Sequence, residues 1–282
     1  MKPIIKYRGG KSREIPEMLP YIPSNYDRYV EPFFGGGAMY FYLEPEKALI
    51  NDLNKPLMDF YAGVRDNFDT LRKELDELEE IYTANRAKFD EAKAETPNAR
   101  VPDANEDLYY QMRELFNGKK GKYSPAAVYF FINKTAYSGM IRYNKSGEYN
   151  VPYGRYKNFN TRLVTKEHSE LLQEAEIMCG DYEDVFSLCG KDDFVFLDPP
   201  YDCIFSDYGN EQTRDGFNEI EHRRLADAYY KLSSKALMVI GLTELTHELY
   251  KDNIVHEYTK SYAVNIRNRF KSAAKHILVA NY

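Results

Sequence analysis

The 282-residue sequence has few of the features that place a chain in a membrane, in a disulfide-bonded framework or around a metal. No apolar run approaches the roughly 20 residues that a membrane-spanning helix needs, and the N-terminus lacks the apolar segment of a signal peptide. The three cysteines, Cys179, Cys189 and Cys203, have no CxxC spacing, so we expect free thiols in a reducing, cytoplasmic compartment. The five histidines form no metal-spaced pair, and we expect no bound metal.

Charge is distributed unevenly along the chain, although the formal net charge is −6. Residues 66–107 contain thirteen acidic and six basic side chains, whereas residues 119–166 contain ten basic side chains and a single acid, Glu148. Two further stretches, 2–13 and 260–275, each carry five basic residues and no acid. Such clusters are typical of nucleic-acid-binding proteins, and an ordinary solvated surface is the alternative.

The strongest chemical signal is an apolar run at 194–197 followed by Asp198, Pro199, Pro200 and Tyr201. The run predicts a strand buried on both faces, and the prolines end it because they lack N–H donors and fix φ. The Asp198 carboxylate, the Pro199 carbonyl and the Tyr201 ring are therefore held just past the carboxyl end of a strand. Open α/β sheets bind their ligands at that edge.

The two acceptors Asp198 and Pro199 suit an exocyclic aromatic amine such as N6 of adenine. Holding both N–H bonds of this weak nucleophile would aim its lone pair at an electrophile, while Tyr201 offers a face for stacking. A tight Pro-Pro turn with a solvated aspartate is the plain alternative. Similar motifs also serve protein-amide and RNA-base methylation, so this motif alone leaves the substrate open.

A second candidate binding element is a glycine-rich turn at 31–37, Glu-Pro-Phe-Phe-Gly-Gly-Gly, between a short strand and an apolar helix. The glycines permit close approach of a ligand to the backbone. Fifteen residues after Gly37, a second strand ends at Asn51-Asp52, where a carboxylate can hold ribose hydroxyls. This spacing favours a nucleoside cofactor over a plain turn, and the absence of GKS or GKT argues against a phosphate-binding loop.

The middle of the chain is predicted to be mainly helical. Apolar residues recur every three or four positions from Leu57 to Tyr82, with Asn54 as N-cap. Further helices are expected at about 105–116 and, capped by Ser124-Pro125, at 125–135. The segment 141–152 differs: its alternation around Asn144-Lys145-Ser146-Gly147 predicts a β-hairpin. Its arginines interleaved with aromatics suit DNA phosphates, guanine edges and base stacking, whereas an exposed hairpin with routine charges is the alternative.

The last third returns to alternating strands and helices. A helix is expected at 166–176, and a strand at 177–179 leads to Asp181 and Tyr182, which would flank an adenine ring or simply cap the helix 182–189. The polar run 202–215 is long enough for a lid. A helix at 219–234 capped by Asn218, strands at 236–242 and 276–281, and a basic loop at 258–271 complete the chain.

With these motifs in place, the chain resembles the Dam-type, D12-class DNA adenine-N6 methyltransferases over nearly its full length. The resemblance rests on Tyr-x-Gly-Gly-Lys at 7–11, the motif at 31–37, Asn51-Asp52, Asp-Pro-Pro-Tyr at 198–201, and the segment 142–156, which is similar to the target-recognition hairpin of enzymes that methylate GATC. It implies an α/β fold with a Rossmann-like S-adenosylmethionine-dependent methyltransferase sheet. A catalytic domain would comprise 1–56 and 165–282, and a mainly helical target-recognition domain carrying the hairpin would comprise 57–164.

The resemblance also implies roles for individual residues. The catalytic residues would be Asp198, Pro199, Pro200 and Tyr201. S-adenosylmethionine, with S-adenosylhomocysteine as product, would contact Tyr7, Lys11, Phe33, Phe34, Gly35, Gly37, Asp52, Asp181, Tyr182 and Asp198. Tyr7 would pack on this cofactor, Lys11 would meet its carboxylate and Asp52 would hold its ribose. Double-stranded DNA would contact Lys6, Tyr137, Ser138, Met140, Arg142, Asn144, Pro152, Arg155 and Tyr156, with Arg142 at a guanine and Tyr137 as a wedge.

The sequence departs from the family pattern at Ser138, after Tyr201 and at 239–243, which bears on the target site and not on the reaction. We therefore expect a site-specific adenine-N6 methyltransferase that acts on a flipped adenine in duplex DNA, in GATC or a related short site. It would be a nucleoid-associated monomer in solution, and more than one copy on DNA remains open. Two rivals are an inactive DNA-binding protein on the same scaffold, which the intact Asp52, Asp198 and Tyr201 disfavour, and an RNA-base or protein-amide methyltransferase, which the hairpin disfavours.

Overall fold

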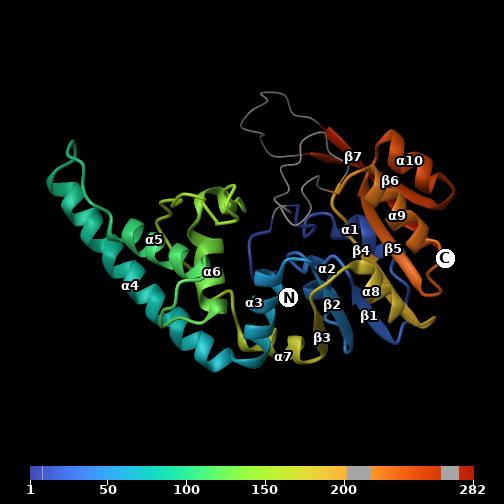
Figure 1. Ribbon diagram of the computed structural model, residues 1–282, viewed down its shortest axis with the longest axis horizontal. Helices are drawn as coiled ribbons and strands as arrows, with labels where there is room; N and C mark the ends of the chain where they lie inside the picture. The colour runs from blue at the N-terminus through green and yellow to red at the C-terminus, as the bar shows by residue number, and fades with distance from the viewer. Residues whose placement is uncertain (8, 202–216, 262–272) are drawn as a thin grey trace. The chain divides into compact units, whose positions relative to one another are not determined.

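The computed structural model describes residues 1–7, 9–201, 217–261 and 273–282 (Figure 1). The chain forms two compact units, which we call the helical unit (residues 1–10 and 54–174) and the sheet unit (residues 11–53 and 175–282). The residues expected to form a lid, 202–215, most of the expected basic loop, 262–271, and Cys203 lie outside the described residues.

One mixed sheet organises the sheet unit. Its strands are β1 (Arg28–Glu31), β2 (Ala48–Asn51), β3 (Ala175–Met178), β4 (Asp193–Leu197), β5 (Lys235–Gly241), β6 (Ile254–Ser261) and β7 (Ala273–Ala280). They follow the order β3-β2-β1-β4-β5-β7-β6, with parallel pairing from β3 to β5 and antiparallel pairing of β7 with both neighbours. Because parallel strands share one carboxyl edge, the residues that follow β1, β2, β3, β4 and β5 emerge at the same edge, where ligands of such sheets bind. This arrangement confirms a mixed α/β fold consistent with a Rossmann-like methyltransferase.

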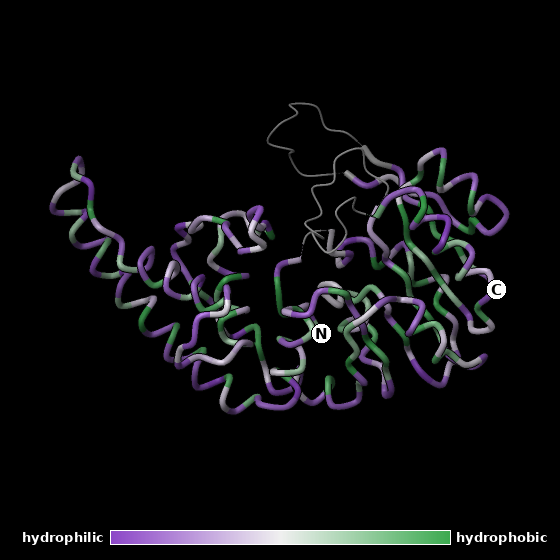
Figure 2. The backbone as a smooth tube through the Cα atoms, in the orientation of Figure 1, coloured by the Kyte–Doolittle hydropathy of each residue, from purple (hydrophilic) through white to green (hydrophobic). Residues whose placement is uncertain are grey.

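Helices cover both faces of this sheet. Inward side chains of α8 (Tyr182–Ser187), α9 (Glu219–Tyr229) and α10 (Glu244–Tyr250) pack with Val30, Val195 and Met238 into one buried cluster. On the other face, Tyr29 packs on α2 (Ala38–Leu43), with its ring 6.3 Å from that of Tyr40. The central strands are therefore apolar on both sides, and Figure 2 shows hydrophobic stretches running along them. Short helical turns α1 (Ile15–Met18), η1 (Leu19–Tyr21) and η3 (Lys251–Asn253) complete this unit.

The described part of the helical unit consists of helices and loops. Its elements are α3 (Lys55–Asp66), α4 (Phe68–Glu95), α5 (Ala104–Phe116), α6 (Pro125–Thr135), η2 (Tyr137–Gly139) and α7 (Lys166–Gln173). The predicted caps are confirmed for α3 and α6, because the side chains of Asn54 and Ser124 accept hydrogen bonds from backbone N–H groups three residues on. Tyr82 is the last buried residue of α4, and the side chains beyond it on this helix are exposed or half-buried.

Three predictions of local structure differ from the observed elements. The helical pattern from Leu57 to Tyr82 forms two helices, because Asn67 leaves helical geometry with φ −133° and ψ 33°. The stretch expected as a basic loop from Tyr258 is strand β6 as far as Ser261. The helix α10 between β5 and β6 was not predicted.

The predicted hairpin at 141–152 is not confirmed. A single antiparallel bridge joins Tyr143 and Tyr149, and no longer strand forms among the described residues of this segment. Two backbone hydrogen bonds flank this bridge, from Asn144 N–H to the Glu148 carbonyl at 2.8 Å and from Asn150 N–H to the Arg142 carbonyl at 3.0 Å. Side chains add to them: Asn144 Oδ1 accepts the N–H groups of Ser146 and Glu148, and Asn117 pairs with both backbone groups of Tyr149. Such side-chain bonds compete with strand pairing.

Candidate active site

The predicted catalytic aspartate lies directly after β4 and is ion-paired. Lys11 Nζ lies 2.7 Å from Oδ1 and 2.8 Å from Oδ2 of Asp198. The lysine side chain is 5 % exposed and that of Asp198 is 22 % exposed, so the pair is largely shielded from water. Burial raises the pKa of Asp198, and the charge and hydrogen bonds of Lys11 oppose this rise. Lys11 therefore favours the ionised carboxylate.

The ring of Tyr201 belongs to the same cluster. Lys11 Nζ lies 4.8 Å from the centre of this ring, and the His276 ring meets it edge-on at 5.0 Å. A glycine of β5, Gly241, backs the ring, because a Cβ there would lie only 3.4 Å from it. Pro199 is buried and Pro200 half-buried between Asp198 and this ring. The structure thus brings Lys11, Asp198 and Tyr201 together, as the motif predicted for the latter two.

Behind Tyr201 and Lys11 lies a buried carboxylate that sequence reasoning missed. Glu14 accepts hydrogen bonds from His276 Nδ1 at 2.7 Å, Tyr258 at 2.7 Å and Lys260 at 2.5 Å. Burial raises the pKa of Glu14, but the bonds from His276 and Lys260, the charge of Lys11 and the bond from Tyr258 outweigh it and bring the pKa to about 2. Four donor or charged groups around one ionised acid make a rigid support beneath the Asp198 cluster.

A second buried acid, Glu31, ends β1 on the α2 side of the sheet. The Tyr29 hydroxyl donates to its Oε2 at 2.7 Å. Burial raises the pKa of Glu31 well above its ordinary value; the bond from Tyr29 opposes this, whereas the charges of Asp198 and Asp52 add to it. Burial thus disfavours the charged form of Glu31 at the carboxyl edge of the sheet.

The glycine turn is fixed by backbone hydrogen bonds to β2 and the residue after it. Gly35 N–H donates to Asp52 Oδ2 at 2.9 Å, and Phe34 N–H donates to the Asn51 carbonyl at 2.8 Å. Gly35 and Gly37 have φ values of 49° and 63°, the left-handed region that glycine adopts without strain. The turn and the second-strand acid predicted to act together are thus adjacent.

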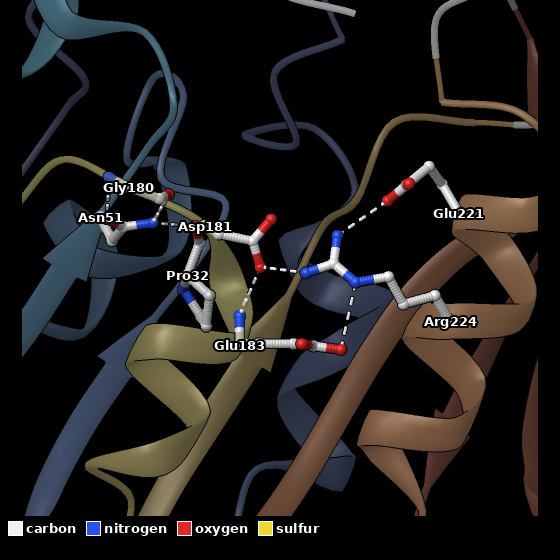
Figure 3. A network of polar contacts seen from close by, with 7 residues as sticks. All are labelled: Pro32, Asn51, Gly180, Asp181, Glu183, Glu221 and Arg224. Carbon is white, nitrogen blue, oxygen red and sulfur yellow. Dashed lines mark hydrogen bonds and ion pairs between the residues drawn. The ribbon is translucent and has the colours of Figure 1, made fainter.

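Asn51 ties three strand ends together (Figure 3). Its amide donates to the carbonyls of Pro32 at 3.0 Å and Gly180 at 2.9 Å, and its oxygen accepts the Gly180 N–H at 2.9 Å. The next residue, Asp181, caps α8 by accepting the Glu183 N–H at 2.9 Å, which confirms its predicted capping role. The Asn51-Asp52 motif predicted a role for Asp52 only, and the tie made by the buried Asn51 amide was not predicted.

Of the aromatic residues expected at the cofactor, Phe33 is accessible, whereas Tyr182 and Phe34 are buried. Tyr182 is 3 % exposed, and its ring lies 5.2 Å from that of Phe33, which is half-buried. Phe34 is 2 % exposed and packs within the turn against Tyr40. In this geometry Phe33 offers the accessible ring, and Tyr182 supports it from beneath.

In the helical unit, Lys6 lies beside the loop expected to meet DNA. Its ammonium lies 4.3 Å from the centre of the Tyr156 ring, and Asn133 bonds to both its backbone N–H and carbonyl. Tyr137 and Met140 are exposed, by 50 % and 36 %. Between them Ser138 has φ 56°, a left-handed conformation that is strained for a non-glycine residue.

The predicted DNA-reading arginines already have protein partners. Arg142 donates from Nε to Asn150 Oδ1 at 2.8 Å and from Nη2 to the Asn150 carbonyl at 3.1 Å. Arg155, with φ 54°, pairs with Glu106 at 3.0 Å, a partner that sequence reasoning missed. Asn144 shapes the turn that follows Tyr143, and Pro152 is exposed.

Tyr7 belongs to the helical unit, and its carbonyl accepts the Gly10 N–H at 3.2 Å. A buried cation that was not singled out, Lys134, donates to the Ile4 carbonyl, and burial lowers its pKa to about 8.

The predicted site residues form several groups of contacting residues. Those in the sheet unit are Lys11 with Asp198 and Tyr201, Gly35 with Asp52, and Phe33 with Tyr182. In the helical unit, Lys6 contacts Tyr156.

Two negative observations apply to the described ranges only. No helix there is long and apolar enough to cross a membrane. No three histidine, cysteine, aspartate or glutamate side chains gather there in a way that could hold a metal ion.

Comparison with known proteins assigns the chain. Residues 7–266 match the model of the family described as D12 class N6 adenine-specific DNA methyltransferase. The chain is 32 % identical to the Type II methyltransferase M.CviBI of Paramecium bursaria Chlorella virus NC1A, with both chains covered in full. It is 33 % identical to the Type II methyltransferase M.MjaIII of Methanocaldococcus jannaschii, over all of this chain and 99 % of that protein. It is 27 % identical to the DNA adenine methylase of Haemophilus influenzae, over 88 % of this chain and 82 % of that protein. With a match across both units and over the Asp-Pro-Pro-Tyr strand end, the chain belongs to the D12 class N6 adenine-specific DNA methyltransferases.

Proposed function

We propose that this methyltransferase transfers a methyl group from S-adenosylmethionine to N6 of an adenine flipped out of duplex DNA, in GATC or a related short site. The observation that carries the proposal is the cluster at the end of β4. There the Asp198 carboxylate, the Pro199 carbonyl and the Tyr201 ring stand together at the carboxyl edge of the sheet. The glycine turn and Asp52 follow β1 and β2 at the same edge.

The chemistry of the residues at this edge fits an S-adenosyl donor. The donor would be held by Asp52 at its ribose, by the Phe33 ring at its adenine and by the turn at Gly35, with Lys11 at its carboxylate and Tyr7 against it. Gly35 and Gly37 adopt positive φ without strain, and a Cβ at Gly37 would meet the Phe34 ring at 2.5 Å. When bound, S-adenosylmethionine supplies an electrophilic methyl group on a sulfonium.

The chain's own residues then position the amine. The Asp198 carboxylate and the Pro199 carbonyl accept the two N–H bonds of N6, which directs the nitrogen lone pair toward the methyl group. Stacking on Tyr201 offsets part of the few kcal/mol that base extrusion costs. The charge and hydrogen bonds of Lys11 oppose the rise in the Asp198 pKa and so favour the carboxylate, the form that accepts hydrogen bonds and does not donate them. Catalysis is thus mostly orientation of a weak nucleophile.

DNA recognition is proposed for the helical unit, with the target-recognition domain at 57–164 and the catalytic domain at 1–56 and 165–282. The exposed Tyr137, the strained Ser138 and the cations Lys6, Arg142 and Arg155 supply wedge, phosphate and base contacts of the kinds that DNA-reading proteins use. The target GATC is supported by the resemblance of residues 142–156 to GATC-reading enzymes.

One experiment tests activity, base and site together. Expression in a host without DNA methylation, followed by sequencing that detects N6-methyladenine, should reveal methylated adenine at one short motif. Asp198→Ala should abolish methylation while duplex binding is retained, whereas Asp192→Ala, in the exposed turn before β4, should methylate normally. Methylation by the Asp198→Ala protein would disprove the catalytic assignment. Binding without methylation by the unaltered protein would favour an inactive scaffold, and methylated RNA or protein would identify another substrate.

A further inference from the structure

A single arginine contacts three carboxylates, two at the start of α8 and one on its own helix, α9. Arg224 of α9 donates from Nη2 to Asp181 Oδ1 at 2.5 Å, from Nε to Glu183 at 3.1 Å and from Nη1 to Glu221 at 3.0 Å (Figure 3). Its guanidinium also lies 4.8 Å from the centre of the Tyr182 ring. Arg224 thus reaches from α9 to the start of α8, where Glu183 and Asp181 lie 41 and 43 positions away in sequence.

These contacts leave Asp181 with one engaged and one open oxygen. Oδ1 accepts both the Glu183 N–H and the Arg224 Nη2, whereas Oδ2 accepts no hydrogen bond from the described residues. The Asp181 side chain is 34 % exposed, and it follows β3 at the carboxyl edge of the sheet. Because the helix cap and the arginine fix the carboxylate plane together, the direction of Oδ2 is fixed as well.

Arg224 also contacts the two aromatic side chains next to Asp181, Tyr182 directly and Phe33 through Tyr182. Arg224 covers Tyr182, and Tyr182 supports Phe33 at 5.2 Å. Three carboxylates share this one guanidinium, so the local charge stays negative and favours ligand groups that donate a hydrogen bond over groups that accept one. An oriented acceptor beside an accessible ring is a fitting contact for an aromatic amine.

We infer that Arg224 is a positioning residue that selects adenine over hypoxanthine in the cofactor, by aiming Asp181 Oδ2 at the exocyclic amine of its adenine ring. This inference rests on the proposed S-adenosyl cofactor. A merely structural role predicts something different: partly exposed ion pairs contribute little, and their loss would weaken binding of every ligand alike. The measurement that separates the two roles is therefore the ratio of affinities for a cofactor with the 6-amino group of adenine and one with the 6-oxo group of hypoxanthine.

The test uses S-adenosylhomocysteine and S-inosylhomocysteine, which differ only in that group, and isothermal titration calorimetry on the full chain. The unaltered protein should bind the adenosine compound about 10-fold to 100-fold more tightly, as expected for loss of one charge-assisted hydrogen bond. Arg224→Ala should reduce this ratio about fivefold or more. Arg224→Lys, which keeps the charge but cannot contact three carboxylates in one plane, should give an intermediate ratio.

Matched variants keep the result interpretable. Arg223→Ala, which removes the neighbouring arginine and its exposed pairs with Glu219 and Glu248, should leave the ratio unchanged. Asp181→Asn retains a good helix cap and should lower the ratio toward one. An unchanged ratio in folded Arg224→Ala and Arg224→Lys proteins overturns the inference while the cofactor assignment stands. Failure of the unaltered protein to bind S-adenosylhomocysteine overturns both.

Discussion

Lys11 contacts both carboxylate oxygens of Asp198, at 2.7 and 2.8 Å, although 187 residues separate them in sequence. Lys11 is the first residue of the sheet unit and Asp198 directly follows β4, so a residue distant in sequence opposes the pKa rise of the acid proposed to hold the amine. Shielding from water helps a site to orient its substrate, but it also raises the pKa of a buried acid. The Lys11 cation opposes that rise at Asp198.

The first prediction concerns this pair. Lys11→Met removes the cation while keeping an apolar stem, so burial loses its strongest opponent and the pKa of Asp198 rises further. Since the proposed mechanism uses the ionised form of Asp198, the acidic limb of kcat/KM should move to higher pH. The exposed Arg13→Met variant is the control and should keep the original limb. An unmoved limb in Lys11→Met, with only a raised KM for the cofactor, would mean that Lys11 acts on the cofactor and not on Asp198.

The second prediction concerns Glu14. Its pKa in the folded protein, about 2, lies below its ordinary value of 4.5, so ionised Glu14 stabilises the fold above the ordinary pKa, and this stability is lost as pH falls toward 2. Glu14→Gln should lower the free energy of unfolding at neutral pH by on the order of 3 kcal/mol, as measured by urea denaturation. The difference from the unaltered protein should shrink between pH 4.5 and 2. Glu17→Gln, an exposed acid of the same short helix, should show neither effect.

The sequence predicted those parts of the fold that depend on local patterns. The four apolar residues before Asp198 gave β4, and Asn54, Ser124 and Asn218 cap helices as their positions indicated. Each of these depends on residues within a few positions of one another, where side-chain chemistry and backbone geometry are directly linked.

Partners distant in sequence could not be predicted in the same way. Glu14 meets His276 across 262 positions and Arg155 meets Glu106 across 49, and any of the chain's many acids could have filled either place. Strand β6 was read as a loop at its end because an edge strand carries polar and charged residues that weaken its apolar alternation. The break at Asn67 was hidden because apolar spacing continues through it.

The third prediction concerns Glu31, whose pKa lies well above the ordinary 4.5 because the side chain is buried. The folded protein keeps a proton that the unfolded chain releases, so the free energy of unfolding should fall as pH rises above the ordinary value toward the raised one. The amide side chain of the Glu31→Gln variant cannot ionise, so the variant should lack this pH dependence. Its free energy of unfolding should therefore rise relative to that of the unaltered protein as the pH is increased. Denaturation at a series of pH values measures it, and parallel pH profiles for the two proteins would show that Glu31 is ionised in the fold.

The fourth prediction concerns how Arg142 reads DNA. Asn150 holds its guanidinium through Nε and Nη2, which fixes the direction of the remaining donor edge. If that edge meets a guanine, Arg142→Ala should cost about 1–3 kcal/mol of discrimination at one base pair and leave the other positions unaffected. Asn150→Ala should relax the same position to a smaller extent, because the arginine is kept but no longer oriented. Methylation rates on duplexes with each base pair exchanged in turn measure this, with Lys145→Ala, in the exposed turn, expected to affect all duplexes equally and to lower the salt dependence of binding. Uniform weakening in Arg142→Ala would instead place this arginine at a phosphate, and the base-reading role would pass to another residue of the helical unit.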